Sequence, residues 1–80
     1  MIYVIDDDNR VNRGYQLLLK STDLESLAFD SVEEFLKCWK PSAHDVLILD
    51  MQMPGMTGMD LLAYLMQNAL QLPVIVVTAY

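Results

Sequence analysis

Carboxylates at the ends of two apolar runs are the side chains of this sequence best suited to chemistry. The apolar run at residues 2–5 leads directly into Asp6 and Asp7, and the run at residues 46–49 leads into Asp50. If these runs are strands of one parallel sheet, their carboxyl ends meet at one edge, and the acids come together. Like charges held close repel and raise one another's pKa unless something neutralises them.

A hard divalent cation is the neutralising agent that the sequence indicates. No Lys or Arg follows Lys40, and the acids have no His or Cys beside them. Mg²⁺ characteristically uses one or two carboxylates together with waters and phosphate oxygens, and Mn²⁺ is an acceptable substitute. This combination suggests phosphoryl transfer to an aspartate nucleophile, with the metal offsetting the charge. Thr78, which follows a third apolar run at residues 74–77, has a hydroxyl able to donate to a phosphoryl oxygen.

Four strands and three helices are expected to position these groups. The runs at 2–5, 46–49 and 74–77 are rich in β-branched residues and lack polar alternation, which is typical of strands covered on both faces. Residues 24–29 predict a weaker edge strand. Helices are predicted over 9–20, after a capping box at Ser31, and after a related motif at Thr57, with Asp8 or Asn9 capping the first. The order β-α-β-α-β-α-β predicts an α/β fold around a parallel sheet, with ligands at the carboxyl ends of the strands.

The apolar residues of each predicted helix are expected to form its buried face. They are Val11, Tyr15, Leu18 and Leu19 in the first helix; Phe35, Leu36 and Trp39 in the second; and Leu62, Leu65, Met66 and Ala69 in the third. We expect Cys38 to be a buried thiol near a helix end. His44 is expected to be a solvated surface residue, and the methionines between Met51 and Met66 to pack in the core and loops.

Length and composition point to one small domain. The chain has 80 residues, 54% of them hydrophobic, and a net charge of −6. Binding of nucleic acid by this segment is not expected, because affinity for phosphate backbones needs clustered cations. The single cysteine fits a reducing compartment, and the apolar runs are far shorter than a bilayer span. The chain opens on a strand without a charged leader, so we expect a cytoplasmic protein with no membrane partner.

Three segments carry a resemblance to a known family. Residues 4–8, 47–58 and 76–79 closely resemble the receiver domain of two-component response regulators, most of all the nitrogen-fixation-type subgroup. The signature Asp50-x-x-Met53-Pro54-x-x-x-Gly58 is highly specific, and the resemblance covers residues 1–80. It implies a flavodoxin-like, doubly wound parallel sheet. Residues 1–80 would then be a partial receiver domain, with the family's fifth strand and last helices missing.

The resemblance also implies a role for each matching residue. Asp50 resembles the phosphoacceptor, Asp7 a direct ligand of Mg²⁺, and Asp6 a ligand acting mainly through water. Asp50 itself and the backbone carbonyl of Gln52 would complete the metal site, and Thr78 resembles the switch hydroxyl. The implied partner is a sensor histidine kinase, and the implied output is an effector outside these residues, expected to be transcriptional and to bind DNA through a separate domain.

Two alternatives to a phosphoacceptor module remain open. One is a phosphotransfer enzyme that turns over an aspartyl phosphate, as haloacid-dehalogenase-like phosphatases do. Those enzymes carry a second Asp two residues after the nucleophile, whereas this sequence has Gln52 there. The other is an interaction or dimerisation module that keeps only the fold. Because the strand at 74–77 would lack one neighbour, we also expect the 80-residue chain to self-associate.

Overall fold

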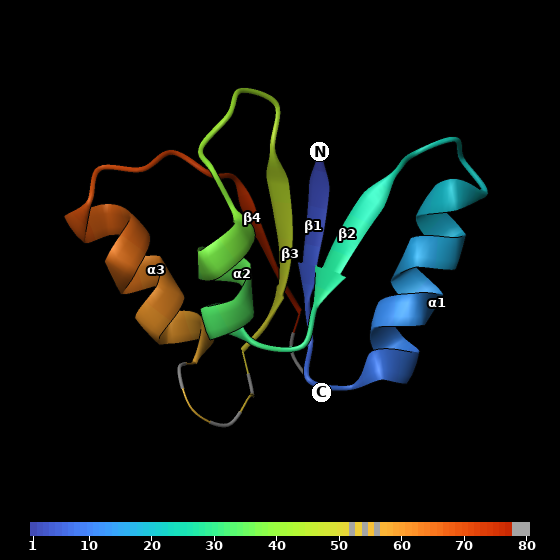
Figure 1. The fold of residues 1–80 in the computed structure, drawn as a ribbon, viewed down its shortest axis with the longest axis horizontal. Helices are drawn as coiled ribbons and strands as arrows, with labels where there is room; N and C mark the ends of the chain where they lie inside the picture. Colours follow the sequence, from blue (N-terminus) through green and yellow to red (C-terminus); the bar gives the residue numbers. More distant parts are fainter. Residues whose placement is uncertain (52, 54, 56, 78–80) are drawn as a thin grey trace.

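The computed structural model describes residues 1–51, 53, 55 and 57–77 of the chain (Figure 1). Its elements in chain order are β1 (Ile2–Ile5), α1 (Asn9–Lys20), β2 (Ser26–Phe29), α2 (Val32–Cys38), β3 (Val46–Asp50), α3 (Gly58–Gln67) and β4 (Val74–Val77). All predicted strands and helices are therefore present in the predicted order. Within the described part of the chain, no helix is both long and apolar enough to cross a bilayer.

The four strands form one parallel sheet in the order β2-β1-β3-β4. Ile5 of β1 pairs with Leu49 of β3, and Asp50 pairs with Val77 of β4. The chain therefore winds outward from β1 in one direction and then reverses toward β3 and β4. Figure 1 shows α1 on one side of the sheet and α2 and α3 on the other. This arrangement confirms the predicted doubly wound, flavodoxin-like fold.

The main core lies between the sheet and helices α2 and α3. The fully buried members of this core are Ile5, Val32, Phe35, Leu47, Leu49 and Leu61. Phe35 stacks on Trp39 with ring centroids 5.4 Å apart and also meets the edge of Tyr3 at 5.4 Å. The predicted aromatic core of α2 is confirmed. Ile5 near the end of β1 and Leu49 near the end of β3 both belong to this core and pair with each other, so the carboxyl ends of these two strands lie side by side.

The prediction for the buried face of α1 was wrong. Val11 and Leu18 are 39% and 65% exposed, and with Tyr15 they line a surface hollow rather than the core. The buried residue of α1 is Asn12, and Leu19 is half-buried. α1 packs mainly against β2 at the side of the sheet, so the helix presents a different stripe inward from the one that its apolar residues indicated.

Corrections also apply to α3, to Cys38 and to part of the methionine set. α3 buries Leu61 and Leu65, whereas Met66 is 82% exposed and Ala69 lies beyond the end of the helix with a positive φ of 51°. Cys38 is exposed, not buried. Met53 is buried and Met51 packs against the core, as predicted, whereas Met59 is 63% exposed. His44 is exposed, as expected.

A buried carboxylate lies at the amino ends of the strands, at the opposite end of the sheet from the predicted site. Asp45, directly before β3, is 5% exposed. Its Oδ2 accepts a hydrogen bond from the Trp39 indole Nε1 at 3.1 Å, and its Oδ1 is 3.3 Å from the amino group of Met1. That amino group also donates to the carbonyl oxygen of His44 at 3.1 Å. The chain's own donors thus satisfy both oxygens of Asp45.

Candidate functional site

Three carboxylates meet where β1 and β3 end. Asp6 and Asp7 follow β1, and Asp50 is the last residue of β3, the strand beside it in the sheet. One oxygen from each carboxylate lies within 4.8 Å of the others. Asp7 is exposed, whereas Asp6 and Asp50 are half-buried. The grouping of Asp6, Asp7 and Asp50 predicted from the sequence is therefore present, and we call these three residues the acid cluster.

Local hydrogen bonds hold the chain that carries Asp6 and Asp7. The Asp6 backbone N–H donates to the Phe29 carbonyl at the end of β2, at 3.2 Å. The Asp6 carboxylate Oδ1 accepts from the Asp8 N–H at 2.9 Å. The Asp8 side chain in turn accepts from the Arg10 N–H at 2.9 Å and caps α1, as one of the two predicted caps. The segment between β1 and α1 is thus a defined turn.

The pKa values of the Asp6 and Asp8 carboxyls shift in opposite directions. Burial raises the pKa of the Asp6 carboxyl above its ordinary value of 3.8, and the charges of Asp50, Asp7 and Asp8 add to this effect, against the opposing hydrogen bond from the Asp8 N–H. The pKa of Asp8 is lowered, first by the hydrogen bond from the Arg10 N–H and then by the Arg10 side chain. A cation bound at the acid cluster would relieve the repulsion that acts on Asp6.

The segment after Asp50 is shaped by a glycine and a capped helix. A Cβ at Gly58 would lie 3.2 Å from Cα of Met51 and 3.3 Å from the carbonyl oxygen of Asp50, so any larger residue would require this backbone to shift. The Thr57 side chain accepts from the Asp60 N–H at 3.3 Å, and Asp60 accepts from the Thr57 N–H at 2.9 Å. This complete capping box fixes the start of α3 beside the end of β3.

The donor set of the acid cluster fits a hard divalent cation. All three side chains offer carboxylate oxygens, and this chemistry suits Mg²⁺ or Mn²⁺ rather than a softer metal. The two other predicted site residues, Gln52 and Thr78, lie outside the described residues. The described part of the site therefore comprises Asp6, Asp7 and Asp50.

Sequence reasoning missed Asn12 as a residue of this region. Asn12 is 5% exposed, and its side-chain Nδ2 donates to the carbonyl oxygen of Asp6 at 2.8 Å. The position of Asn12 in the sequence could have indicated this contact. Asn12 lies four residues after the capping Asp8 and therefore on the same side of the helix. Apolar periodicity alone favoured Val11 instead and so concealed this contact.

Fold and site together define a class of protein: a doubly wound α/β module with three carboxylates gathered at the carboxyl ends of its central strands. The model of the response regulator receiver domain matches residues 2–80 of this chain. The chain therefore belongs to the receiver domain family of two-component response regulators, whose function is phosphoryl-accepting signal transduction.

Curated relatives agree with this assignment. The chain is 31% identical over 80 residues to Nodulation protein W of Bradyrhizobium diazoefficiens and 36% identical over 80 residues to Response regulator protein TodT of Pseudomonas putida. It is also 34% identical over 80 residues to DNA-binding transcriptional regulator NtrC of Escherichia coli. All of this chain is covered in each case, but it spans only 35% of the first two relatives and 17% of the third.

Solved structures show the same fold. The chain matches response regulator StyR with a TM-score of 0.93 and 38% identity, covering 99% of this chain and 40% of that one. It matches response regulator protein TrrA of Thermotoga maritima, solved in complex with Mg²⁺-BeF, with a TM-score of 0.85 and 28% identity, covering 99% of this chain and 69% of that one.

Proposed function

We propose that Asp50 accepts a phosphoryl group from a sensor histidine kinase, with a divalent cation held by Asp6, Asp7 and Asp50. The observation that carries this proposal is the meeting of three carboxylates within 4.8 Å at the carboxyl ends of adjacent central strands. Asp50 is the last residue of β3, and the next helix, α3, begins after its cap at Thr57. The similar protein TrrA was solved in complex with Mg²⁺-BeF, and this supports the proposal that this chain also binds Mg²⁺.

The proposed step is an in-line displacement at phosphorus. An oxygen of the Asp50 carboxylate attacks the phosphorus of a phosphohistidine, an O–P bond forms, and the N–P bond breaks. The departing imidazole keeps the bonding electron pair and takes up a proton from solvent. Asp50 must be ionised to attack, and it begins the step in the field of two further carboxylates.

Asp6, Asp7 and Asp50 would hold a divalent cation, and that cation would offset the negative charge that gathers during transfer. Asp7 is the most exposed acid of the cluster and is proposed as a direct ligand, while Asp6 acts mainly through water. The backbone carbonyl of Gln52 is proposed as a further ligand. The Thr78 hydroxyl is proposed to donate to a phosphoryl oxygen, since Thr78 follows Val77, the residue paired with Asp50.

The substitution Asp50→Asn tests the phosphoacceptor. The chain is incubated with acetyl phosphate and Mg²⁺, and the intact mass is measured. We expect the parent chain to gain one phosphoryl group and the Asp50→Asn variant to gain none, because the amide is not a nucleophile of this kind. Asp30→Asn, which changes an exposed acid outside the cluster, is the matched control and should behave as the parent. Equal uptake by the Asp50→Asn variant would show that the assignment is wrong.

We propose further that the module accepts a phosphoryl group but does not catalyse repeated hydrolysis of phosphate esters. Phosphatases that use an aspartyl phosphate place a second Asp two residues after the nucleophile, and this sequence has Gln52 at that position. A slow, unassisted decay of the phosphorylated chain would agree with this proposal. Multiple turnovers of a phosphate ester in a steady-state assay would contradict it.

The setting and the output of the signal are proposals as well. We propose a cytoplasmic protein whose output is transcriptional, since the similar proteins TodT and NtrC are by name a response regulator and a DNA-binding regulator. This segment itself is not expected to contact DNA, because its net charge is −6. Salt-dependent binding of duplex DNA by residues 1–80 would contradict that expectation.

Self-association through β4 is proposed from the exposed side chains of that strand. Among the described residues β4 pairs only with β3, and Ile75 and Val76 are 55% and 45% exposed. Unpaired strand edges with apolar side chains favour pairing with another chain. Light scattering of the 80-residue chain is expected to give a mass above that of a monomer, and a compact monomer at tens of micromolar, as a rough working concentration, would refute the proposal.

A further inference from the structure

Asn12 is a polar side chain placed where α1 meets the sheet. It is 5% exposed, although the apolar Val11 and Leu18 of the same helix are 39% and 65% exposed. An amide removed from water is costly unless it is hydrogen-bonded. Burial of Asn12 in preference to its apolar neighbours therefore indicates that its hydrogen bonds matter to this region.

The Asn12 amide joins the ends of two strands at the acid cluster. Its Nδ2 donates to the carbonyl oxygen of Asp6 at 2.8 Å and to the carbonyl oxygen of Phe29 at 3.2 Å. The same Phe29 oxygen accepts from the Asp6 N–H, and the Asn12 N–H donates to the Asp8 carbonyl at 3.1 Å. The Asn12 side chain thus joins the turn that carries Asp6 and Asp7 to α1, in addition to the hydrogen bonds within that turn.

The other half of the amide makes no comparable contact. Within the described part of the chain, the buried Oδ1 of Asn12 has no hydrogen-bond partner. Two carbonyl oxygens already require the Nδ2 donor, so the amide orientation is fixed by Nδ2 alone. Asn12 also lines a polar cavity of about 420 Å³ together with Asn9, Arg13 and Gln16, which leaves room for a side chain of altered shape.

We propose that Asn12 is a positioning residue for the metal site. Its hydrogen bond to the Asp6 carbonyl fixes the backbone from which the carboxylates of Asp6 and Asp7 project toward Asp50. Without it, the turn has more conformations available, and the cluster loses the arrangement that binds a cation tightly. Groups that orient metal ligands commonly account for tenfold or more in affinity. The inference rests on the metal site of the proposed function, but not on phosphoryl transfer.

The substitution Asn12→Leu isolates the Nδ2 donor. Leucine has a similar size, and removal of Oδ1 breaks no hydrogen bond to a described residue, so the main loss is the donor to Asp6 and Phe29. Binding of Mn²⁺ is measured from the electron paramagnetic resonance signal of the free ion, with Mg²⁺ as competitor. We expect the dissociation constant for Mn²⁺ to rise about tenfold.

Asn68→Ala is the matched control. Asn68 Nδ2 likewise donates to a backbone carbonyl, that of Tyr64 at 2.8 Å, but at the end of α3 and away from the acid cluster. Urea unfolding of both variants separates lost stability from lost metal affinity. We expect Mn²⁺ affinity to be unchanged in Asn68→Ala. Equal affinities of the parent and the folded Asn12→Leu variant would overturn the inference.

A second measurement needs no variant. In nuclear magnetic resonance spectra of the parent chain, addition of Mg²⁺ is expected to shift the side-chain amide signals of Asn12 and leave those of Asn68 in place. Unmoved Asn12 signals in the presence of bound Mg²⁺ would overturn the inference while leaving the metal site intact. Absence of any Mn²⁺ or Mg²⁺ binding would refute the metal site and the inference together, whereas uptake of phosphate on Asp50 is read independently by mass.

Discussion

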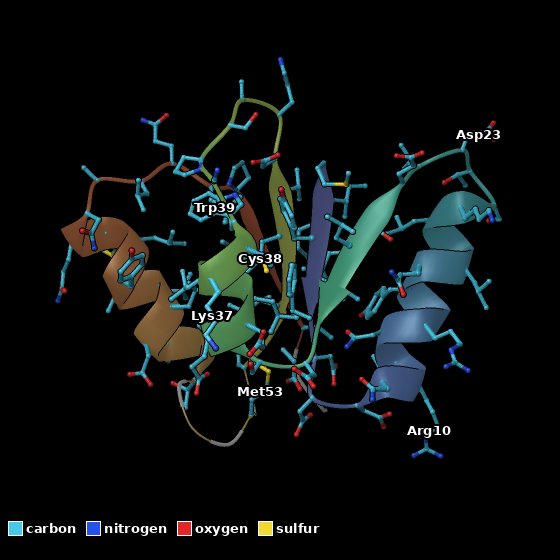
Figure 2. The ribbon with its side chains drawn as sticks, viewed as in Figure 1. Arg10, Asp23, Lys37, Cys38, Trp39 and Met53 are labelled. Carbon is cyan, nitrogen blue, oxygen red and sulfur yellow. The ribbon has the colours of Figure 1, made fainter. Side chains whose placement is uncertain are left out.

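Aspartates have opposite roles at the two ends of the strands. We call the end where the strands begin the amino edge of the sheet, and the end where they finish the carboxyl edge. At the amino edge, Asp45 is 5% exposed, and it meets the Trp39 indole and the Met1 amino group. At the carboxyl edge, Asp6, Asp7 and Asp50 lie within 4.8 Å of one another. Figure 2 shows Trp39 near one end of the sheet and Met53, of the segment after Asp50, near the other.

The difference lies in what neutralises each carboxylate. A buried charge is tolerated when it is paired and hydrogen-bonded by the chain itself, and such a group serves the fold. Burial raises the pKa of Asp6, and the charges of Asp50, Asp7 and Asp8 raise it further. An added cation would relieve this repulsion between the acids. Mutations at the amino edge should therefore lower the free energy of unfolding. Mutations at the carboxyl edge should instead weaken metal binding and phosphoryl transfer.

The largest expected effect on stability is at Asp45. The substitution Asp45→Ala leaves the buried Trp39 Nε1 without an acceptor and removes the ion pair of the partly exposed Met1 amino group. An unsatisfied buried donor costs up to about 3 kcal/mol. We expect the free energy of unfolding in urea to fall by about this amount. For so small a domain this loss is a large share of the free energy of unfolding.

The exposed acid Asp30 supplies the control for this experiment. Asp30→Ala should change the free energy of unfolding by less than about 0.5 kcal/mol, since surface substitutions usually do. If Asp45→Ala were as mild as Asp30→Ala, the contrast between the two edges would fail.

A smaller effect is expected from Trp39→Phe. Phenylalanine keeps an aromatic ring against Phe35, where the centroids are now 5.4 Å apart at 17°, but it removes the donor to Asp45. A hydrogen bond to a charged group contributes about 1.5–3 kcal/mol, so we expect a loss near 2 kcal/mol. Circular dichroism must follow the unfolding, because Trp39 is the only tryptophan.

The double variant sharpens this prediction. If Trp39 acts through Asp45, the two losses should not add when Trp39→Phe and Asp45→Ala are combined. Fully additive losses would show that Trp39 stabilises the protein by packing on Phe35 alone.

The sequence predicted the carboxyl edge far better than the amino edge. Asp6, Asp7 and Asp50 stand at the ends of uniform apolar runs, and parallel pairing alone brings such ends together. Asp45 gives no comparable signal, because its partners Trp39 and Met1 come from separate segments and meet it only through the packing of α2 and β1.

Helix faces were predicted less reliably than strands. A strand covered on both faces buries its side chains whichever way it is turned, so β1 and β3 needed no choice of face. For α1 the choice depended on apolar periodicity, and hydrogen bonds of Asn12 to two strand ends determined the buried face instead. In α3 the predicted stripe correctly included Leu65, but it also contained Met66, which is exposed, and it left out Leu61, which is fully buried. Both errors come from tertiary contacts that a local pattern does not contain.

The smallest expected effect is the gain in stability from Mg²⁺ at the carboxyl edge. A ligand that binds only the folded chain at ten times its dissociation constant adds about 1.4 kcal/mol to the free energy of unfolding. We expect thermal unfolding of the parent chain near pH 7 to show this gain. The variant Asp7→Ala removes a proposed direct ligand and should lose most of it. An equal gain in Asp7→Ala would contradict the ligand assignment.

The pH dependence of that gain follows from the raised pKa of Asp6. Without metal, a carboxyl whose pKa is higher in the folded chain than its ordinary 3.8 stabilises the fold most when protonated, so this contribution is present below pH 3.8 and is lost as pH rises through the folded pKa. Mg²⁺ requires the ionised carboxylate, so its stabilisation runs the opposite way and declines as pH falls through the same interval. Mg²⁺ should raise the unfolding temperature, and this increase should become smaller as pH falls. The decline should begin at a higher pH than it would if the pKa of Asp6 were the ordinary value for aspartate. The Asp6→Asn variant should move the onset of this decline to lower pH, and an unchanged onset would show that Asp6 does not govern the cation site.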